Sequence, residues 1–390
     1  MKIKYIIIEV KSLKKIIILF MIVSLLIGAL SFKFTEAKGN DISSTVTGNT
    51  YGQDNNLLSS FVKVTNSANV SSQDVNSFIF KAQNVIMEEK KEQSPQISTF
   101  SQSLVTNKEA YDYFYIDGEN KNLYFYEDSP STSPIAKIVN LDTKIANDFI
   151  SKQTSNNIYM QNLAAVSTIS GGIGARAFVS TGNLLEARIH TDGNVGVLES
   201  NKGTTYTYVG FTGNTEADAG LQYSPKSQNG VQAWKPYMKV GENYPWGNDT
   251  MLSGYDAVQY NNGFIPGEDV QVSFWKKYFH DNVSTARVKL QGMAKCANST
   301  CSNATPTKLA VIMEKNGSGI AEITNYKILA TIADIKDPQT HAVITKASGS
   351  LNTSVSNITV DGISRVPTQS AKSSNSSMSI SSNSVSFNIR

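Results

Sequence analysis

From Ser167 onwards, apolar and polar residues alternate in short runs that are separated by glycine and asparagine. Three separators share one form: TGN at 181–183, DGN at 192–194 and TGN at 212–214. Gly and Asn accept the positive φ that tight hairpin turns require, so these tripeptides indicate turns. The alternating runs predict strands over 174–180, 184–190, 195–200, 205–211, 217–223, 231–240, 270–275, 286–293, 308–314, 322–330 and 342–346. Such short, evenly spaced strands are typical of a mainly β protein, an antiparallel β-sandwich of the lectin-like or jelly-roll kind.

A different pattern comes before these strands. Apolar residues recur at three- and four-residue spacing between 74 and 91, which predicts an amphipathic helix. Aromatic-rich runs at 111–116 and 123–126 flank a turn with Asp117 and Gly118, and they predict a β-hairpin. A weaker amphipathic run over 135–150 suggests a second, short helix. We therefore expect a small α+β module over 73–156, followed by a sandwich domain over 157–346.

The remaining segments are of low complexity or strongly apolar. Residues 38–72 are expected to be a flexible polar stretch, and 347–390 a Ser/Asn-rich segment with one edge strand at 385–389.

Five lysines precede an apolar run of 17 residues at 16–32, and Thr35-Glu36-Ala37 follows as a cleavage site. This layout predicts a signal peptide over 1–37 and a secreted or surface-held protein. A run of this length also reaches the short limit of a membrane span, so an uncleaved anchor is the alternative.

Charge separates the export segment from the rest of the chain. The formal charge is +3, but residues 1–37 contain six Lys and two Glu, so the remainder has 29 basic and 30 acidic residues and a charge of −1. Charged residues make up only 17%, and Ser, Asn, Thr and Tyr are abundant. A nearly neutral, hydroxyl-rich surface disfavours nucleic acid as a partner and favours uncharged, hydroxyl-rich ligands. The membrane is expected as a partner only through the N-terminal segment.

The cysteines and histidines indicate a disulfide and no metal. Cys296 and Cys301 are separated by a turn-forming Ala-Asn-Ser-Thr spacer, and an even number of cysteines in an exported chain favours a local disulfide. The three histidines, at 190, 280 and 341, are scattered, whereas a metal site needs about four clustered ligands. No phosphate-binding loop is present either, so no cofactor is expected.

Alternation on the central strands places polar and aromatic residues on one side. If strands 184–190, 205–211 and 217–223 lie in one sheet, their outward residues form one face: Glu186, Arg188, His190, Tyr206, Tyr208, Glu216, Asp218 and Gln222. Such a face can bind a glycan. The alternative is an ordinary solvated face with cross-strand ion pairs.

Part of that face also has the residue types for catalysis. Glu216 and Asp218 are two residues apart on a strand, which suits the separation of about 5–9.5 Å between glycosidase carboxyl groups. Laminarinase-like sandwich enzymes have a Glu-x-Asp-x-Glu strand, and here Gly220 stands where their general acid would be. A lyase would instead use His190 and Arg188 with a Tyr. If the protein is an enzyme, its catalytic residues would be among Glu216, Asp218, His190 and Arg188. We expect no catalytic activity.

Loop aromatics give a further set of candidate binding residues. Trp234, Tyr244 and Trp246 lie in or beside a stretch rich in Pro, Gly and Asn. Rings presented on loops can stack on sugar faces while nearby amides bind hydroxyl groups. The alternative for each ring is packing in the core.

Three stretches carry a family resemblance: "HTDGNVGVLES", "TYVGFTGNTEADAGLQYS" and "WKPYMKVG". With them, about residues 160–340 resemble the YrpD-type family of exported proteins from Gram-positive bacteria. The resemblance implies export and a β-rich domain, and it assigns no activity and no site residue. The sequence thus predicts a non-catalytic binder of polysaccharide or cell-envelope glycan. The alternatives are a hydrolase or lyase acting on polysaccharide, and a structural or coat protein without a ligand.

Overall fold

The computed structural model describes residues 62–92, 109–117, 120–130, 132–140, 169, 171–213, 216–223, 232–241, 260–280, 283–296, 305–316, 323–336 and 342–390. The expected signal peptide and most of the flexible polar stretch lie outside these residues. Among the helices that are described, none is both long enough and apolar enough to span a membrane.

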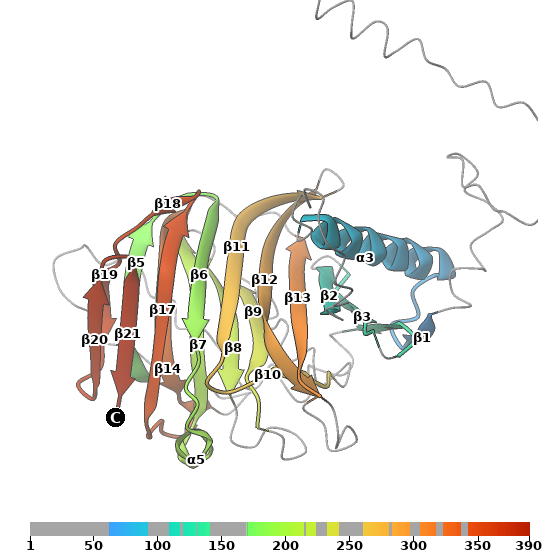
Figure 1. Ribbon diagram of the computed structural model, residues 1–390. Coiled ribbons are helices and arrows are strands. Elements are labelled where there is room, and N and C mark those ends of the chain that lie inside the picture. Colours follow the sequence, from blue (N-terminus) through green and yellow to red (C-terminus); the bar gives the residue numbers. More distant parts are fainter. Residues whose placement is uncertain are drawn as a thin grey trace, which may run out of the picture. The chain divides into compact units, whose positions relative to one another are not determined.

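The described strands form two large sheets (Figure 1). Sheet A has the order β1 (Lys63–Asn66), β4 (Ile135–Asn140), β3 (Asn122–Asp128), β2 (Glu109–Asp117), β13 (Thr307–Asn316), β12 (Val283–Cys296), β11 (Asp269–His280), β6 (Leu184–His190), β17 (Leu351–Val360), β21 (Ser384–Ile389) and β20 (Ser376–Ser381). Two short strands join it at the side: β10 (Asn262–Phe264) on β12 and β18 (Ile363–Ser364) on β17. Sheet B has the order β19 (Thr368–Lys372), β5 (Gly172–Ser180), β14 (Ile323–Ala333), β7 (Thr204–Gly213), β8 (Glu216–Tyr223) and β9 (Lys235–Gly241). A separate ribbon pairs β15 (Ile335–Lys336) with β16 (Val343–Thr345).

The two sheets bury their apolar faces in one shared core, which confirms the mainly β prediction. On β6, Leu185 and Ile189 are buried, and on β8 the alternate residues from Ala217 to Tyr223 are buried, as the alternation predicted. Across the core, the rings of Phe211 on β7 and Phe274 on β11 stack with centroids 5.3 Å apart. Side chains from both sheets therefore interdigitate as in a sandwich.

The N-terminal module is attached to sheet A as additional strands and one helix. The helix α3 (Ser72–Glu92) and the β2–β3 hairpin confirm the two predicted elements. Phe78 of α3 contacts Tyr124 of β3 with ring centroids 5.1 Å apart, so the apolar stripe of the helix covers this end of the sheet. β2 runs parallel to β13 and pairs with it over eight residues, which makes the module continuous with the sandwich (Figure 1).

A buried charged cluster fixes α3 against the sheet. Arg287 on β12 bonds to Glu89 on α3 and, at 3.1 Å, to Glu314 on β13. Lys289 also bonds to Glu89, and the Tyr113 hydroxyl donates to Glu314 at 2.7 Å. Arg287, Glu89 and Glu314 are almost fully buried. Because each charge has an opposite partner, the cluster can stay buried, and it joins α3 to β12 and β13.

Two local predictions were wrong. Residues 135–140, expected to begin a helix, form β4, because Ala136 and Ile138 alternate toward the core and pair with β3 and β1. Residues 195–200, expected to be a strand, form the short helix α5 (Val195–Ser200). Its N-cap is Asn194, whose side chain accepts a hydrogen bond from the Val197 N–H at 3.3 Å.

The C-terminal segment differs most from the expectation of one edge strand. Residues 351–389 contribute five strands, β17 to β21, to the two sheets. β17 lies between β6 and β21, inside sheet A, and its residues Leu351, Val355 and Val360 are fully buried. The abundant Ser, Asn and Thr residues conceal this alternation because many of them occupy the outward positions.

Candidate functional site

The polar face predicted from three strands is divided between the two sheets. β6 belongs to sheet A, whereas β7 and β8 belong to sheet B, so the premise that they share one sheet was wrong. The chain crosses from one sheet to the other through α5, where a strand was expected. Arg188 and His190 therefore point outward from sheet A, while Tyr208 and Asp218 point outward from the opposite sheet. Glu216 pairs through its backbone with Gly241 on β9, also in sheet B.

On sheet B, the predicted binding residues are packed together and largely covered. Tyr206 lies 6.3 Å from Tyr208 and 5.2 Å from Tyr237, measured between ring centroids. Tyr206, Tyr237 and Gln222 are buried. Asp218 forms an ion pair of 2.6 Å with Lys327, which is 2% exposed. These residues make a packed layer and not an open platform for a ligand.

Of the loop aromatics, only Trp234 is described. It is fully buried in the sandwich core, where its ring meets Tyr223 edge-on at 5.5 Å and its Nε1–H donates to the Asp192 carbonyl at 3.3 Å. Its interpretation as a sugar-stacking residue is therefore corrected to a core residue. Tyr244 and Trp246 lie outside the described residues. Cys296 ends β12 and Cys301 is not described, so the disulfide stays a prediction.

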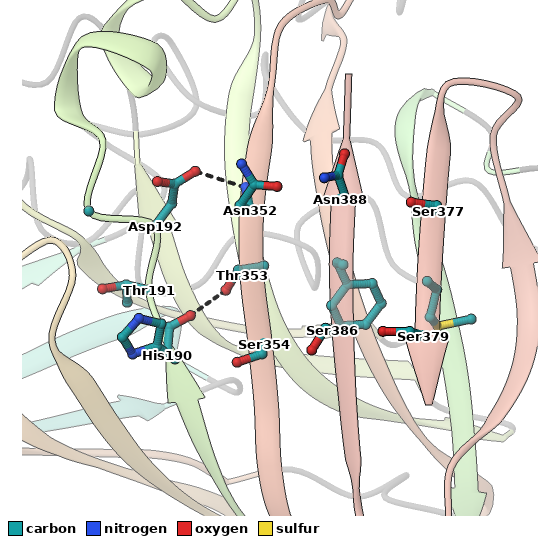
Figure 2. Close-up of a pocket in the computed structure, with 13 residues that line it drawn as sticks. His190, Thr191, Asp192, Asn352, Thr353, Ser354, Ser377, Ser379, Ser386 and Asn388 are labelled. Carbon is teal, nitrogen blue, oxygen red and sulfur yellow. Dashed lines mark hydrogen bonds between the residues drawn. The ribbon is translucent and has the colours of Figure 1, made fainter. Parts of the chain in front are cut away.

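The outward face of sheet A carries a polar row that crosses five adjacent strands. Asp269 on β11 pairs with His190 on β6, which pairs with Ser354 on β17. Ser354 pairs with Ser386 on β21, which pairs with Ser379 on β20. All five are at outward positions, where they are exposed or half-buried. Figure 2 shows the four residues from His190 to Ser379 side by side.

A second row lies two residues further along these strands. Asn352 pairs with Asn388, and Asn388 pairs with Ser377. The backbone N–H of Asn352 donates to the Asp192 carboxylate at 2.8 Å (Figure 2). Together the rows, apart from Asp269, line a hollow of about 550 Å³. Its lining presents hydroxyl and amide groups and the apolar side chains of Met378 and Phe387, with the imidazole of His190 and the carboxylate of Asp192 at one side.

His190 is held in a defined orientation at the edge of the hollow. Its Nδ1 lies 2.7 Å from Asp269 Oδ1, and Arg188 Nη1 lies 3.5 Å from the other oxygen of that carboxylate. The His190 side chain is 55% exposed. A carboxylate can only accept, so Nδ1 carries the proton of this hydrogen bond and Nε2 is left for another partner. Arg188 and Asp269 have opposite charges, so these two charges offset one another beside His190.

Hydrogen bonds between threonine hydroxyls and the backbone hold the chain around His190. The Thr353 hydroxyl donates to the His190 carbonyl at 2.6 Å. The Thr191 hydroxyl donates to the Glu268 carbonyl at 3.0 Å and accepts from the Gly267 N–H at 3.0 Å. These bonds join the chain at His190 and Thr191 to β17 and to the loop that precedes β11.

A second cluster of titratable groups lies beneath the surface, where the module meets the sandwich. Asp112 on β2 is fully buried and accepts hydrogen bonds from the Tyr260 hydroxyl at 2.6 Å and the Asn262 amide at 2.9 Å. Its cross-strand neighbour is Glu127 on β3. Burial, and then the charge of Glu127, raise the pKa of Asp112 to about 8. Burial thus favours the protonated form of Asp112. Since no part of Asp112 reaches the surface, we assign it to the interface between the N-terminal module and the sandwich and not to a site.

Sequence reasoning identified His190 and Arg188 but missed their partners. Asp269, Ser354, Ser386 and Asn352 come from three other strands, which the sequence does not place beside β6. The alternation within 351–360 is the one signal that could have found Ser354 and Asn352, because buried residues alternate there with exposed Asn and Ser.

Comparisons with known proteins give one family match. Residues 166–389 match the family model described as "Domain of unknown function, YrpD". The "Uncharacterized protein YrpD" of Bacillus subtilis (strain 168) is 31% identical over 228 residues, which cover 58% of this chain and 84% of the relative. Among solved structures, scytalido-glutamic peptidase with a transition state analog inhibitor is 13% identical, with coverage of 57% of this chain and 100% of that chain and a TM-score of 0.31. SCP-B of the Eqolisin peptidase family, in complex with the tripeptide Ala-Ile-His, matches with the same identity and coverage and a TM-score of 0.33. We draw nothing from scores this low.

Proposed function

Since the chain belongs to the YrpD family, a family described without a function, we propose from its own surface that the sandwich binds a hydroxyl-rich polymer, a polysaccharide or cell-envelope glycan, without catalysis. The ligand would lie on the outward face of sheet A, in the hollow between β6 and β20. The observation that carries the proposal is the pair of polar rows around that hollow.

The chemistry of the rows suits a sugar. Ser and Asn side chains offer both donors and acceptors at the strand spacing of about 4.8 Å, so several hydroxyl groups of one chain can be bound at once. Each hydrogen bond contributes only about 1 kcal/mol after the loss of water. Affinity for a single short glycan should therefore be weak, and a polymer that occupies several rows or several molecules should bind more tightly.

Catalysis is left out of the proposal because neither candidate set is arranged for it. For the carboxylate pair on sheet B, Asp218 is already ion-paired with the buried Lys327. For the lyase set, Tyr206 and Tyr208 lie on sheet B, whereas Arg188 and His190 are on the outward face of sheet A. Export is part of the proposal: we expect the mature chain to begin after Ala37, and N-terminal sequencing of the secreted protein tests this.

The binding experiment uses the full chain and insoluble polymers, namely purified cell-wall sacculi and a panel of polysaccharides, in a sedimentation assay. We expect Asn352→Ala with Asn388→Ala, and separately Ser386→Trp, to lower binding at least tenfold. The first removes amide groups and the second fills the hollow. Gln271→Ala is the matched control, because Gln271 is an exposed amide on the same face outside the hollow, and its binding should stay within twofold.

Three outcomes would overturn the proposal. The wild-type chain could sediment with none of the polymers, as a structural or coat protein without a ligand would. The hollow variants could bind as well as the wild type. The wild type could also release reducing sugar or unsaturated products from a polymer, which would show an enzyme.

A further inference from the structure

A second hollow lies near the end of β17 that is opposite to the first hollow, where we propose that glycan binds. The first hollow contacts residues 352–354 of β17, whereas β18 pairs with Thr359 and Val360 at the far end of that strand. The second hollow measures about 460 Å³ and is lined by residues of β5, β14, β18 and β19 and of the β18–β19 connection: Phe178, Val179, Ser180, Asn325, Ser364, Arg365, Val366 and Thr368. Its size falls in the range of small-ligand sites.

Arg365 is the one charged residue in this lining. Within the described part of the chain its guanidinium has neither an ion pair nor a hydrogen-bond acceptor, and its Nε is buried without a partner. The other arginines differ in having a partner for the charge or for Nε: Arg188 pairs with Asp269, Arg176 Nε donates to the Ser370 hydroxyl at 2.9 Å, and Arg287, whose Nε is also unpartnered, pairs with Glu89 and Glu314 through its Nη groups. Since Nε lies beneath the surface, a ligand in the hollow would meet the guanidinium through its Nη groups, which have no acceptor among the described residues.

The nearest carboxylate along the chain is already in use. Asp361 accepts hydrogen bonds from the backbone N–H groups of Asn183 and Leu184, at 3.0 and 2.9 Å. Its negative charge is thus directed to the start of β6 and not to the guanidinium. The rest of the hollow is uncharged, with hydroxyl groups of Ser180, Ser364 and Thr368 and the amide of Asn325.

We propose that this second hollow binds an acidic sugar through its anionic group, a carboxylate or a phosphate, with Arg365 as the anion-binding residue. A guanidinium forms two parallel hydrogen bonds to either group. The surrounding hydroxyl and amide groups can bind the sugar hydroxyls, and Phe178 and Val366 offer apolar surface to the sugar body. Val366 is 66% exposed, which leaves the hollow open on its side. The site is independent of the glycan face and of the proposal made for it.

The test follows the Nε–H signal of Arg365 by NMR while calorimetry measures affinity. The chain has only five arginines, so these signals can be assigned by substitution. The probes are digalacturonic acid for a carboxylate source, glucose 1-phosphate for a phosphate source, and the methyl ester of the first as the neutral form. We expect at least one acid to shift the Arg365 signal and to bind at least tenfold more tightly than the ester.

Variants separate the guanidinium from general positive charge. Arg365→Gln should lower affinity at least tenfold, Arg365→Lys should lower it less, and Val366→Glu, which adds a carboxylate beside the hollow, should lower it at least fivefold. Lys372→Gln is the control, since Lys372 is an exposed cation on β19 outside the lining, and its affinity should stay within twofold. Unchanged thermal melting shows that the variants fold.

Each result decides the proposal. Binding of only one acid supports it and identifies the source of the anion. It is overturned if neither acid shifts the Arg365 signal, if the ester binds as tightly as the acid, or if Arg365→Gln binds like the wild type. Arg365→Gln should sediment with neutral polysaccharides as the wild type does. If the anion-binding proposal fails, the glycan-binding proposal for sheet A is therefore unaffected.

Discussion

Glu89 on α3 and Arg287 on β12 form an ion pair in which both side chains are buried, although the two residues are 198 positions apart in the chain. It joins the N-terminal module to a strand within the family match. Such a pair adds little net stability when compared with apolar residues, but removing one member leaves the other charge buried and uncompensated.

We therefore expect Glu89→Gln to lower the free energy of unfolding by about 3 kcal/mol, measured by urea denaturation. Its neighbour Glu88 is exposed, so Glu88→Gln should change stability by less than about 0.5 kcal/mol. A double-mutant cycle with Arg287→Met should show coupling, and equal effects of the two glutamate substitutions would contradict the buried pair.

The buried Asp112, which lies where the N-terminal module meets the sandwich, should make the stability of the fold depend on pH. Its pKa is about 8 in the folded protein and near 3.8 when unfolded, so between these values the folded state binds more protons. The contribution of Asp112 to the free energy of unfolding should be greatest below about pH 4. It should fall by up to about 1.4 kcal/mol for each pH unit until about pH 8.

Urea denaturation at pH 5 and pH 8 measures this slope. Asp112→Asn should make it shallower, because the amide does not titrate, and the remainder comes from Glu127, whose pKa burial also raises. Tyr260→Phe removes a hydrogen bond that lowers the pKa of Asp112, so the loss of stability should extend to higher pH in that variant. An unchanged slope in Asp112→Asn would assign the effect to other groups.

Trp234 should matter for stability and not for ligand binding. Trp234→Ala leaves a cavity in the core and should cost about 3–5 kcal/mol, measured by chemical denaturation. Trp234→Phe keeps most of the packing and loses the bond to the Asp192 carbonyl. If the folded Trp234→Phe protein bound glycan at least tenfold more weakly, the assignment to the core would be incomplete.

Asn201 ties the start of β7 to the approach to β17. Its Oδ1 accepts from the Ser350 N–H at 2.8 Å, and its Nδ2 donates to the Ser350 carbonyl at 2.9 Å. Gly349 has a φ of +136°, and a Cβ there would lie 2.0 Å from Asn201 Oδ1. Asn201→Ala should cost about 2 kcal/mol and Gly349→Ala at least as much.

The double variant tests the contact. It should be less destabilised than the sum of the two single changes, because removing the Asn201 side chain also removes the clash with the new Cβ. Thermal and urea denaturation give the four free energies, and strict additivity would show that the two residues act separately.

Local patterns predicted the parts of this fold that depend on local physics. The stripe from Val75 to Ile86 predicted α3, and the alternation on β6 and β8 predicted which residues are buried. The sequence could not show that the chain changes sheets after His190, because that depends on a six-residue helix whose cap, Asn194, also fits a hairpin turn. The row from Asp269 to Ser379 joins five strands that are distant in sequence, so no local pattern could reveal it.

The parallel pairing of β2 with β13 has a consequence for solubility. Within residues 166–389, β13 would be the last strand of sheet A on that side, with a row of unpaired N–H and C=O groups along an apolar strand. Exposed strand edges of this kind recruit other chains and lead to aggregation. The N-terminal module occupies that edge from within the same molecule and moves the sheet boundary to β1, a strand of only four residues. We therefore expect a chain without the module to self-associate more readily than the full chain.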